Sequence, residues 1–411
     1  MISELNRVPL GWEKVKFGDI AKNVTDRIDD PKTSGLKDYI GLEHLETDEI
    51  RIKRYGSPDE VEATKFLCKK GDIIFGKRRA YLRKIAVTSR DAVVSAHSMV
   101  LRPRAEKILP EFLPWFMYSS QFWKTAFAVS EGSLSPTIKW KTLSAQEFWL
   151  PSQNEQRKIA EILWSIESNV EELEHLIQVA EKFKKGLLKE LLKKGIGHKK
   201  FKKTDLGEIP EDWKIFQIEQ LLIETKYGIS VKLNNEGRYP VIKMDNLSND
   251  LVNFRNGKYV DLNEEVARSY KLQIGDILFN RTNSFEHVGR TATFKLQGEY
   301  LFASYLIMLR PNPNILVPDY LTFFLNSFNS EIKQLATLAV QQANINCTNL
   351  KRFRLPIPPL IEQTKICSII NSQKDQLDIL KNHQLALRNL KKKLTNAFLS
   401  GELFVPLEVM N

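Results

Sequence analysis

The chain contains two tandem copies of one unit, and this repeat limits the folds that it can adopt. Pro9-Leu-Gly-Trp12 corresponds to Pro210-Glu-Asp-Trp213, and further matches follow in the same order, shifted by about 200 residues. The matched segments are 39–45 with 241–247, 70–79 with 274–283, 99–103 with 307–311, and 154–159 with 361–366. We therefore expect two domains of one fold rather than a single large core.

Each copy combines strand and helix signals. Short β-branched runs at 72–75 and 276–279 follow a Gly-Asp pair, which predicts strands. Apolar periodicity predicts amphipathic helices over 109–128 and 317–338. The fold class expected for the globular part of each copy is therefore α+β.

A long helix is expected to follow each domain. Residues 153–194 contain no proline and would form a rod of roughly 60 Å. Antiparallel pairing of the two helices as a coiled coil would cover both apolar stripes, separate the two domains and give the repeat a pseudo-twofold axis. The expected helix–helix seam consists of Ile159, Ile162, Ile166, Leu173, Leu176, Leu187, Ile366, Ile370, Leu377, Leu380, Leu387 and Leu394.

Four segments follow from these signals. The first domain is expected at 1–152, and the central long helix with its linker at 153–204. The second domain is expected at 205–358, and the C-terminal long helix with its tail at 359–411.

Composition narrows the class of function. The formal net charge of +11 favours a polyanionic partner. The three cysteines lack CxxC spacing, and the six histidines lack ligand spacing, so we expect neither a disulfide framework nor a metal site. No apolar run is long enough to cross a membrane and no signal peptide is evident, so a cytoplasmic location without membrane contact is expected.

The motifs of a DNA-modifying enzyme are missing from the sequence. The only Pro-Pro pair, Pro358-Pro359, precedes a helix, and no Walker loop or cofactor-binding glycine turn is present. Asp319 with Glu331 and Lys333 matches a loose nuclease pattern. Because these residues fall on a predicted helix, about three turns apart, they are not expected to share a metal.

Two loops in each copy contain side chains that can read DNA. One loop follows each Gly-Asp strand, and the other follows each amphipathic helix. Arg, Lys, Asn and Gln at such loops can contact base edges and phosphates, although the same residues also occur in ordinary solvated turns. The candidate DNA-binding residues are Lys77, Arg78, Arg79, Tyr81, Arg83, His97, Ser133, Lys139, Asn280, Arg281, Asn283, Arg290, Gln341, Gln342 and Asn344.

These motifs, in this order, resemble the specificity subunit of type I restriction–modification systems. The resemblance covers nearly the whole chain, and it includes the linker from Leu191 to Pro210. The motifs are Gly71-Asp72, Arg102-Pro103, Pro210-Glu-Asp-Trp213, Gly275-Asp276, Arg310-Pro311 and Pro358-Pro-Leu-Ile-Glu-Gln363. The first copy departs from the pattern at Leu150-Pro-Ser-Gln-Asn-Glu-Gln156, where the usual Pro-Pro-Leu is absent.

The resemblance implies a DNA-recognition subunit without catalytic residues. Each domain would be a target recognition domain that reads half of a bipartite sequence in double-stranded DNA, and the paired helices would fix the spacer. Two modification subunits would dock and supply S-adenosylmethionine for adenine methylation. Restriction subunits would use ATP and Mg to cleave unmethylated DNA in host defence. This chain would itself bind no cofactor.

Two other classes of function stay open. A self-contained DNA methyltransferase or nuclease would need cofactor or metal motifs that the sequence lacks. A scaffold that does not read DNA would leave the basic and polar loops without a role.

Overall fold

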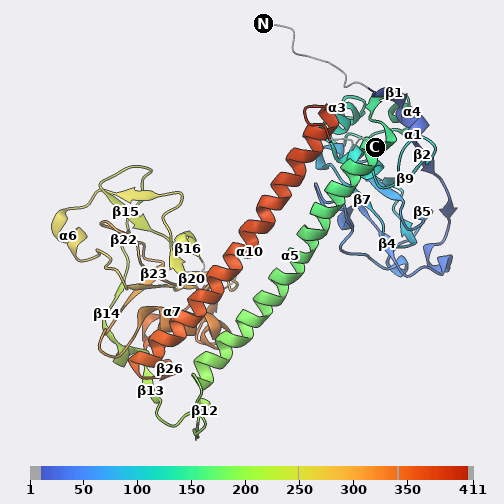
Figure 1. Cartoon of the computed structure of the whole chain (residues 1–411). Helices are drawn as coiled ribbons and strands as arrows, with labels where there is room; N and C mark the ends of the chain where they lie inside the picture. Colours follow the sequence, from blue (N-terminus) through green and yellow to red (C-terminus); the bar gives the residue numbers. More distant parts are fainter. Residues whose placement is uncertain (1–10, 249, 340–341, 406–411) are drawn as a thin grey trace. The chain divides into compact units, whose positions relative to one another are not determined.

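The computed structural model describes residues 11–248, 250–339 and 342–405, and it divides into two compact units. Unit 1 comprises Met1–His175 with Lys381–Asn411, and unit 2 comprises Leu176–Leu380. Both divisions fall inside the two long helices, α5 (Gln153–Lys194) and α10 (Leu360–Ser400), drawn in green and red in Figure 1. Each unit therefore consists of one α+β domain together with one end of each long helix.

The domain of unit 1 is built on two four-stranded sheets and one strand pair. One sheet has the order β2–β9–β6–β7, the other has the order β3–β5–β8–β4, and β1 pairs antiparallel with β10. The strands are β1 (Glu13–Lys16), β2 (Ala21–Val24), β3 (Arg27–Ile28), β4 (Tyr39–Ile40), β5 (Lys65–Cys68), β6 (Ile73–Gly76), β7 (Ile85–Val87), β8 (Ala92–Val94), β9 (Ser98–Pro103) and β10 (Glu147–Leu150). The strand predicted after Gly71-Asp72 is confirmed as β6.

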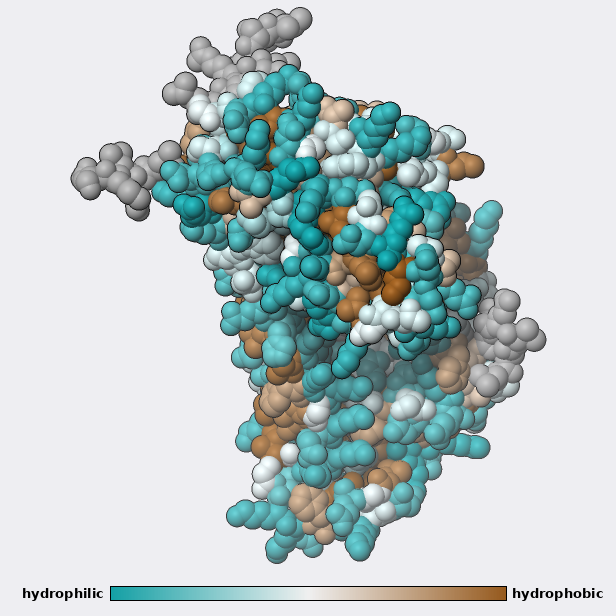
Figure 2. Space-filling model, turned by 90° about the vertical axis from the view of Figure 1, so that its right-hand side faces the viewer, coloured by the Kyte–Doolittle hydropathy of each residue, from teal (hydrophilic) through white to brown (hydrophobic). Residues whose placement is uncertain are grey.

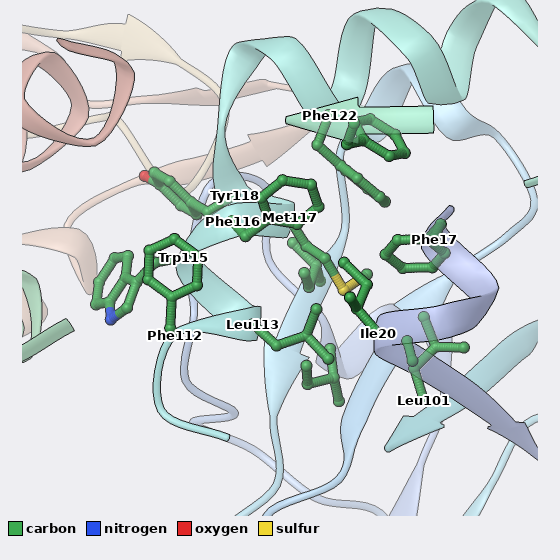
Figure 3. Close-up of a cluster of buried hydrophobic side chains, with 14 of the residues drawn as sticks. Phe17, Ile20, Leu101, Phe112, Leu113, Trp115, Phe116, Met117, Tyr118 and Phe122 are labelled. Atoms are coloured by element: carbon green, nitrogen blue, oxygen red, sulfur yellow. The ribbon is translucent and has the colours of Figure 1, made fainter. Parts of the chain in front are cut away.

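Short helices cover the core of unit 1. They are α1 (Phe17–Ile20), α2 (Leu113–Tyr118), α3 (Ser120–Ala128) and α4 (Trp140–Ser144). The prediction of one continuous helix over 109–128 is wrong at Ser119, whose backbone is extended and whose hydroxyl accepts the Phe122 N–H to cap α3. Figure 3 shows the side chains of α2 packed against Phe17 and Phe122. Leu163 of α5 and Phe398 of α10 belong to the same core.

The domain of unit 2 repeats this plan with a larger sheet. Its six-stranded sheet has the order β14–β23–β19–β21–β17–β16, and its three-stranded sheets have the orders β18–β15–β22 and β20–β25–β24. The strands of the six-stranded sheet are β14 (Leu222–Tyr227), β16 (Leu247–Ser248), β17 (Leu251–Val252), β19 (Ile277–Asn280), β21 (Thr291–Thr293) and β23 (Leu306–Pro311). The remaining strands of these sheets are β15 (Tyr239–Ile242), β18 (Lys258–Val260), β20 (Thr282–Asn283), β22 (Leu301–Phe302), β24 (Thr337–Ala339) and β25 (Gln342–Asn344).

The rest of unit 2 consists of two strand pairs and four short helices. The pairs are β11 (Phe201–Thr204) with β12 (Gly207–Pro210), and β13 (Lys214–Gln217) with β26 (Arg354–Ile357). The helices are α6 (Glu264–Arg268), α7 (Pro318–Ser327), α8 (Asn329–Lys333) and α9 (Cys347–Arg352). The predicted helix over 317–338 is therefore interrupted at Phe328 and ends at Lys333, and the chain then turns into β24.

The repeated Gly-Asp and Arg-Pro motifs form the same buried ion pair in each unit. Arg102 donates two hydrogen bonds of 2.6 Å to Asp72. Arg310 donates bonds of 2.7 and 2.8 Å to Asp276. The two aspartates are 2% and 1% exposed, respectively. A carboxylate buried to this extent requires a charged or hydrogen-bonding partner. This explains why both copies contain the aspartate and the arginine.

The repeated Glu-Gln motif ties each domain to the start of a long helix. Gln156 accepts the Leu109 N–H at 2.9 Å and donates to the Pro151 carbonyl. Gln363 accepts the Val317 N–H at 2.8 Å and donates to the Pro358 carbonyl. Both glutamine side chains are buried, so each one satisfies backbone groups that would otherwise lack partners.

Each unit pairs opposite ends of the two long helices, which therefore run antiparallel as predicted. In unit 1, Lys391 of α10 bonds to Glu167 of α5 at 2.5 Å, and both side chains are 2% exposed. In unit 2, Leu191 and Leu192 of α5 share a core with Ile366 and Ile370 of α10. Among the described residues, no helix has the length and hydropathy needed to cross a membrane.

The buried stripe of the helices is shifted from the predicted seam. Ile159, Ile366, Ile370 and Leu377 are buried as predicted, whereas Leu176 is 46% exposed. The remaining predicted seam residues are half-buried: Ile162, Ile166, Leu173, Leu187, Leu380, Leu387 and Leu394. The stripe that is buried also includes polar residues and other apolar residues, among them Gln156, Ala160, Leu163, Glu167, Val170, Ile177, Gln363, Cys367, Lys391, Thr395 and Phe398.

Candidate nucleic-acid interface

The two candidate loops of unit 2 meet in the structure. Strand β20, in the loop after the Gly-Asp strand, pairs with β25, and β25 pairs antiparallel with β24. The backbone N–H of Ile345 donates to the Arg281 carbonyl at 2.9 Å. Segments that lie about 60 residues apart therefore form one small sheet beside the main one.

The two candidate loops of unit 1 meet in the same way. The Ile138 N–H donates to the Lys77 carbonyl at 2.9 Å, and Arg78 forms an isolated β-bridge with Thr137. Lys77 and Arg281 thus occupy equivalent backbone positions, each directly after its buried β6 or β19 strand. The frame of this surface is the same in both units, but the side chains on it differ.

In unit 1, a cation cluster surrounds His97. The Arg78 guanidinium lies 3.4 Å from the His97 ring nitrogens. Burial lowers the pKa of His97, and Arg78, Lys77 and Lys65 lower it further because each is positively charged. Burial and Arg27 likewise lower the pKa of Lys77.

Arg27 and Lys65 join this surface although the sequence did not single them out. The Arg27 guanidinium carbon and the Lys77 ammonium lie 5.5 and 5.8 Å from the centre of the Phe66 ring. Arg27 and Lys65 belong to β3 and β5, which pair in the second sheet. No local motif marks them, because only the pairing of those strands brings them near the predicted loop. We define the His97 cluster as Arg27, Lys65, Lys77, Arg78 and His97.

Other candidate residues of unit 1 lie exposed around this cluster. Arg79 has a left-handed backbone and an exposed side chain, and Tyr81 is 56% exposed. Ser133 is exposed on the 131–137 loop, and Lys139 pairs with Glu131 at 2.6 Å. Leu134, in the same loop, is 95% exposed and was not among the candidates. A leucine this exposed beside cations can contact a thymine methyl group or a base step.

In unit 2, the corresponding surface combines aromatic rings with one arginine. The Arg281 guanidinium carbon lies 4.7 Å from the centre of the Tyr227 ring. Tyr305 and Phe285 are 52% and 54% exposed. Asn344 accepts a hydrogen bond of 3.0 Å from the Thr282 hydroxyl, which fixes the orientation of its amide. Bases can stack on such rings while arginine and asparagine contact their edges.

Two candidate residues are not exposed as expected, and a third lies beside an acidic group. Asn280 is fully buried and donates to the His287 carbonyl at 3.1 Å, so its side chain does not reach the surface. Arg83 is half-buried and pairs with Asp48 at 3.0 Å. Arg290 is exposed, but it lines a hollow with Asp250, whose carboxylate pairs with Lys374 of α10.

Part of the second candidate loop falls beyond what the structure describes. Gln341 lies outside the described residues. Gln342 and Asn283 lie in β25 and β20, where the structure places the backbone. For these three residues the predicted DNA contacts stay predictions.

Among the described residues, His198, Asp212 and Glu362 form one group with metal-ligating atoms within 4.8 Å of one another. The His198 Nε2 lies 2.8 Å from Glu362, and its Nδ1 lies 3.5 Å from Asp212. Since the two ring nitrogens face different carboxylates, they cannot both bind one ion. Glu362 also accepts the Ile196 N–H and the Trp213 indole N–H. These contacts hold the linker against the start of α10.

The acids of the loose nuclease pattern lie on separate helices, and two of the cysteines are buried. Asp319 lies in α7 and pairs with Lys295 at 2.6 Å, while Glu331 lies in α8. Burial raises the pKa of Cys68 and of Cys367 to about 12, which keeps both thiols protonated near neutral pH. The fold and these two surfaces define a protein with two related domains, each presenting its own set of cationic and aromatic side chains.

Comparison with known sequences identifies the family. The type I restriction modification DNA specificity domain matches residues 9–182 and again 210–389. The chain belongs to this family and is a type I restriction–modification specificity subunit. It is 25% identical to the MjaVIII specificity subunit of Methanocaldococcus jannaschii, over 97% of this chain and 94% of the relative.

Two further relatives cover shorter parts. The MjaX specificity subunit of the same archaeon is 38% identical over an aligned segment. That segment covers 47% of this chain and 46% of the relative. The EcoKI specificity subunit of Escherichia coli K12 is 25% identical over 74% of this chain and 68% of its own length.

Solved structures share the fold. A chain from a study of complex assembly and conformational transition of the type I R-M system aligns with a TM-score of 0.62 at 20% identity, covering 97% of this chain and 100% of the other. The HsdS subunit from Thermoanaerobacter tengcongensis aligns with a TM-score of 0.50 at 21% identity, covering 98% and 100%. The predicted fold class and the predicted family are confirmed.

Proposed function

We propose that each unit reads one half of a bipartite, asymmetric sequence in double-stranded DNA. The observation behind this proposal is that two loops meet on one equivalent surface in each unit but present different side chains. Unit 1 offers Lys77, Arg78 and His97, whereas unit 2 offers Arg281, Thr282 and Asn344. Equal frames with unequal contact residues support two different half-sites.

The long helices support a fixed gap between the half-sites. They contain 42 and 41 residues, which corresponds to rods of roughly 60 Å. Half-sites one helical turn of DNA apart are separated by roughly 34–36 Å. Paired helices of this length can set such a gap, and the buried Lys391–Glu167 pair supports a single register between them.

The chemistry is assigned to partner subunits. In this proposal two modification subunits bind S-adenosylmethionine and methylate adenine, and restriction subunits use ATP and Mg. The sequence lacks the corresponding motifs, and the candidate acids and thiols described above are paired or protonated. This chain then contributes recognition and assembly.

Exposed apolar side chains on the long helices support partner docking. In unit 2, Leu176, Val179 and Phe183 of α5 are 46%, 48% and 58% exposed. Hydrophobic patches interrupt the largely hydrophilic surface in Figure 2. Such side chains are typical of protein interfaces, and the predicted seam residue Leu176 belongs to this exposed stripe.

Changing the centre of that stripe tests docking. Phe183→Glu should abolish co-purification of the modification subunit, because it places a charge in an apolar contact. Ser168→Glu changes an exposed position on the same helix and serves as the matched control. Normal co-purification of the Phe183→Glu chain would rule out this surface as the dock.

The proposed function is tested by expressing the chain with its modification subunit and mapping methylated adenines across a genome. We expect one split, asymmetric motif with a constant gap. Methylation without a split motif would contradict the proposal. The chain alone, incubated with S-adenosylmethionine and DNA, should transfer no methyl groups. Transfer by the lone chain would favour a self-contained methyltransferase, and a complex without sequence preference would favour a scaffold.

A further inference from the structure

The first residue after the buried β6 or β19 strand is a cation over an aromatic ring in both units. Lys77 lies over Phe66, and Arg281 lies over Tyr227. The two cations occupy equivalent positions, since the carbonyl of each accepts the N–H of an isoleucine from the second loop. The rings come from strands that do not correspond, β5 and β14. The cation–ring pair is therefore shared, although its aromatic partner differs between the units.

The Arg281 backbone is fixed while its guanidinium stays available. Its N–H donates to the Tyr305 carbonyl at 3.0 Å, and its own carbonyl accepts from Ile345 at 2.9 Å. Its buried Nε has no hydrogen-bond partner within the described part of the chain. No ion pair of Arg281 is found among the described residues either, so the donors of its terminal guanidinium nitrogens are available to a ligand.

The Tyr227 ring is itself held from two directions. Its backbone, at the end of β14, pairs with Ile307 of β23. Its hydroxyl accepts the N–H of Cys347, the first residue of α9, at 2.9 Å. The ring is nevertheless 41% exposed, which is a high value for a tyrosine fixed at both ends. The Arg281 guanidinium lies over this ring.

We propose that Arg281 reads a guanine in the half-site of unit 2 and that Tyr227 is the positioning residue that orients it. A planar guanidinium with free donors matches the O6 and N7 acceptors that guanine presents in the major groove. Stacking on Tyr227 restricts the rotation of the Arg281 guanidinium. The side chain therefore loses less conformational entropy when it binds guanine. This inference rests on the proposed DNA-reading function.

The test measures methylation of a set of oligonucleotides by the complex of this chain with its modification subunit. The set contains the mapped target and every single-base-pair change in it. Arg281→Ala should reduce the preference at one G·C pair of one half-site by about five- to 150-fold, and Arg281→Lys should reduce it less. The lysine variant keeps the charge and removes the fork, so it separates base reading from folding.

Tyr227→Ala should weaken the preference at that same base pair by about two- to fivefold. Tyr227→Phe keeps the ring but loses the bond to Cys347, and should give a smaller change at the same base pair. Lys77→Ala is the reciprocal control and should affect only the other half-site. Tyr300→Phe removes a hydroxyl group from a ring in a separate apolar cluster. It should leave the preference at every base pair unchanged.

A purely structural role for Tyr227 predicts a different pattern. The rate of methylation by the Tyr227→Ala complex would then decrease by the same factor for every oligonucleotide. That result would overturn the positioning role. An unchanged preference in Arg281→Ala would overturn the guanine assignment. A wild-type complex without a split target would instead refute the proposed function itself, so the two failures are distinguishable.

Discussion

At the scale of single residues, the repeated motifs are explained by hydrogen bonds that keep buried groups satisfied. Asp72 and Asp276 each accept two bonds from an arginine of the neighbouring strand, and Gln156 and Gln363 each bind backbone groups of their own domain. The candidate contact residues after these strands, Lys77 and Arg78 in one unit and Arg281 and Thr282 in the other, differ. The repeat therefore preserves the frame and leaves the contact residues free to change.

His97 should make DNA binding dependent on pH. Its pKa lies below the ordinary value of 6.5, so the free protein holds it neutral at neutral pH. A nearby phosphate would raise that pKa, and binding would then take up a proton. Affinity should rise as the pH falls below neutral, by at most about tenfold for each unit by which binding raises this pKa.

Fluorescence anisotropy with the cognate DNA, at constant ionic strength and between about pH 7.5 and 5.5, measures this dependence. The His97→Asn variant is the control and should flatten it. A wild-type affinity that is equal across this range would show that no phosphate lies near His97.

At the scale of elements, the two long helices are held together by polar as well as apolar side chains. Glu167 and Lys391 are both almost fully buried, and the Lys391 ammonium lies 5.5 Å from the centre of the Tyr118 ring. Arg388 of α10 also pairs with Glu49 and Glu174 in unit 1. Contacts of this kind favour one helix register, because any shift leaves charges buried without partners.

Removing one member of the buried pair should destabilise unit 1. Glu167→Ala leaves the Lys391 charge buried alone, and should lower the free energy of unfolding by about 3–5 kcal/mol. The double variant Glu167→Leu with Lys391→Met should recover most of this loss. Glu147→Ala removes the solvent-exposed pair with Lys14 and should leave the stability nearly unchanged. Denaturant unfolding of the full chain measures these values, and an unchanged stability of Glu167→Ala would contradict the role of the pair.

Helix periodicity predicted the existence of these elements better than their packing. The long helices and the strands after Gly-Asp were found where the sequence predicted them. The buried stripe differs from the predicted helix–helix seam because it includes Glu167 and Lys391. A prediction from hydrophobicity places both residues on the surface. The break at Ser119 was missed because a serine within a helical pattern can also cap a new helix.

The candidate surface was predictable only in part. Lys77, Arg78 and Arg281 lie in loops marked by the repeat itself. Arg27, Lys65 and Tyr227 lie far away in the sequence, and only strand pairing brings them to these loops. The burial of Asn280 follows from its position as the last residue of an inner strand, which the local sequence does not reveal.

At the scale of the whole molecule, the chain comprises two domains with one frame and two contact surfaces. Each domain is joined to one end of both long helices by its glutamine and by its apolar core. In the proposed function, changes in the loops alter what is read, and changes in the helices alter the gap between the half-sites. These two properties should therefore vary independently.

Lengthening both helices tests this central claim most directly. One heptad is inserted after His175 in α5 and another after Leu380 in α10, which keeps the helix-pairing pattern and adds roughly 10 Å. Methylated adenines are then mapped for the complex with the modification subunit. The account predicts unchanged half-sites separated by a gap that is longer by up to about three base pairs. An unchanged gap, or altered half-sites, would contradict it.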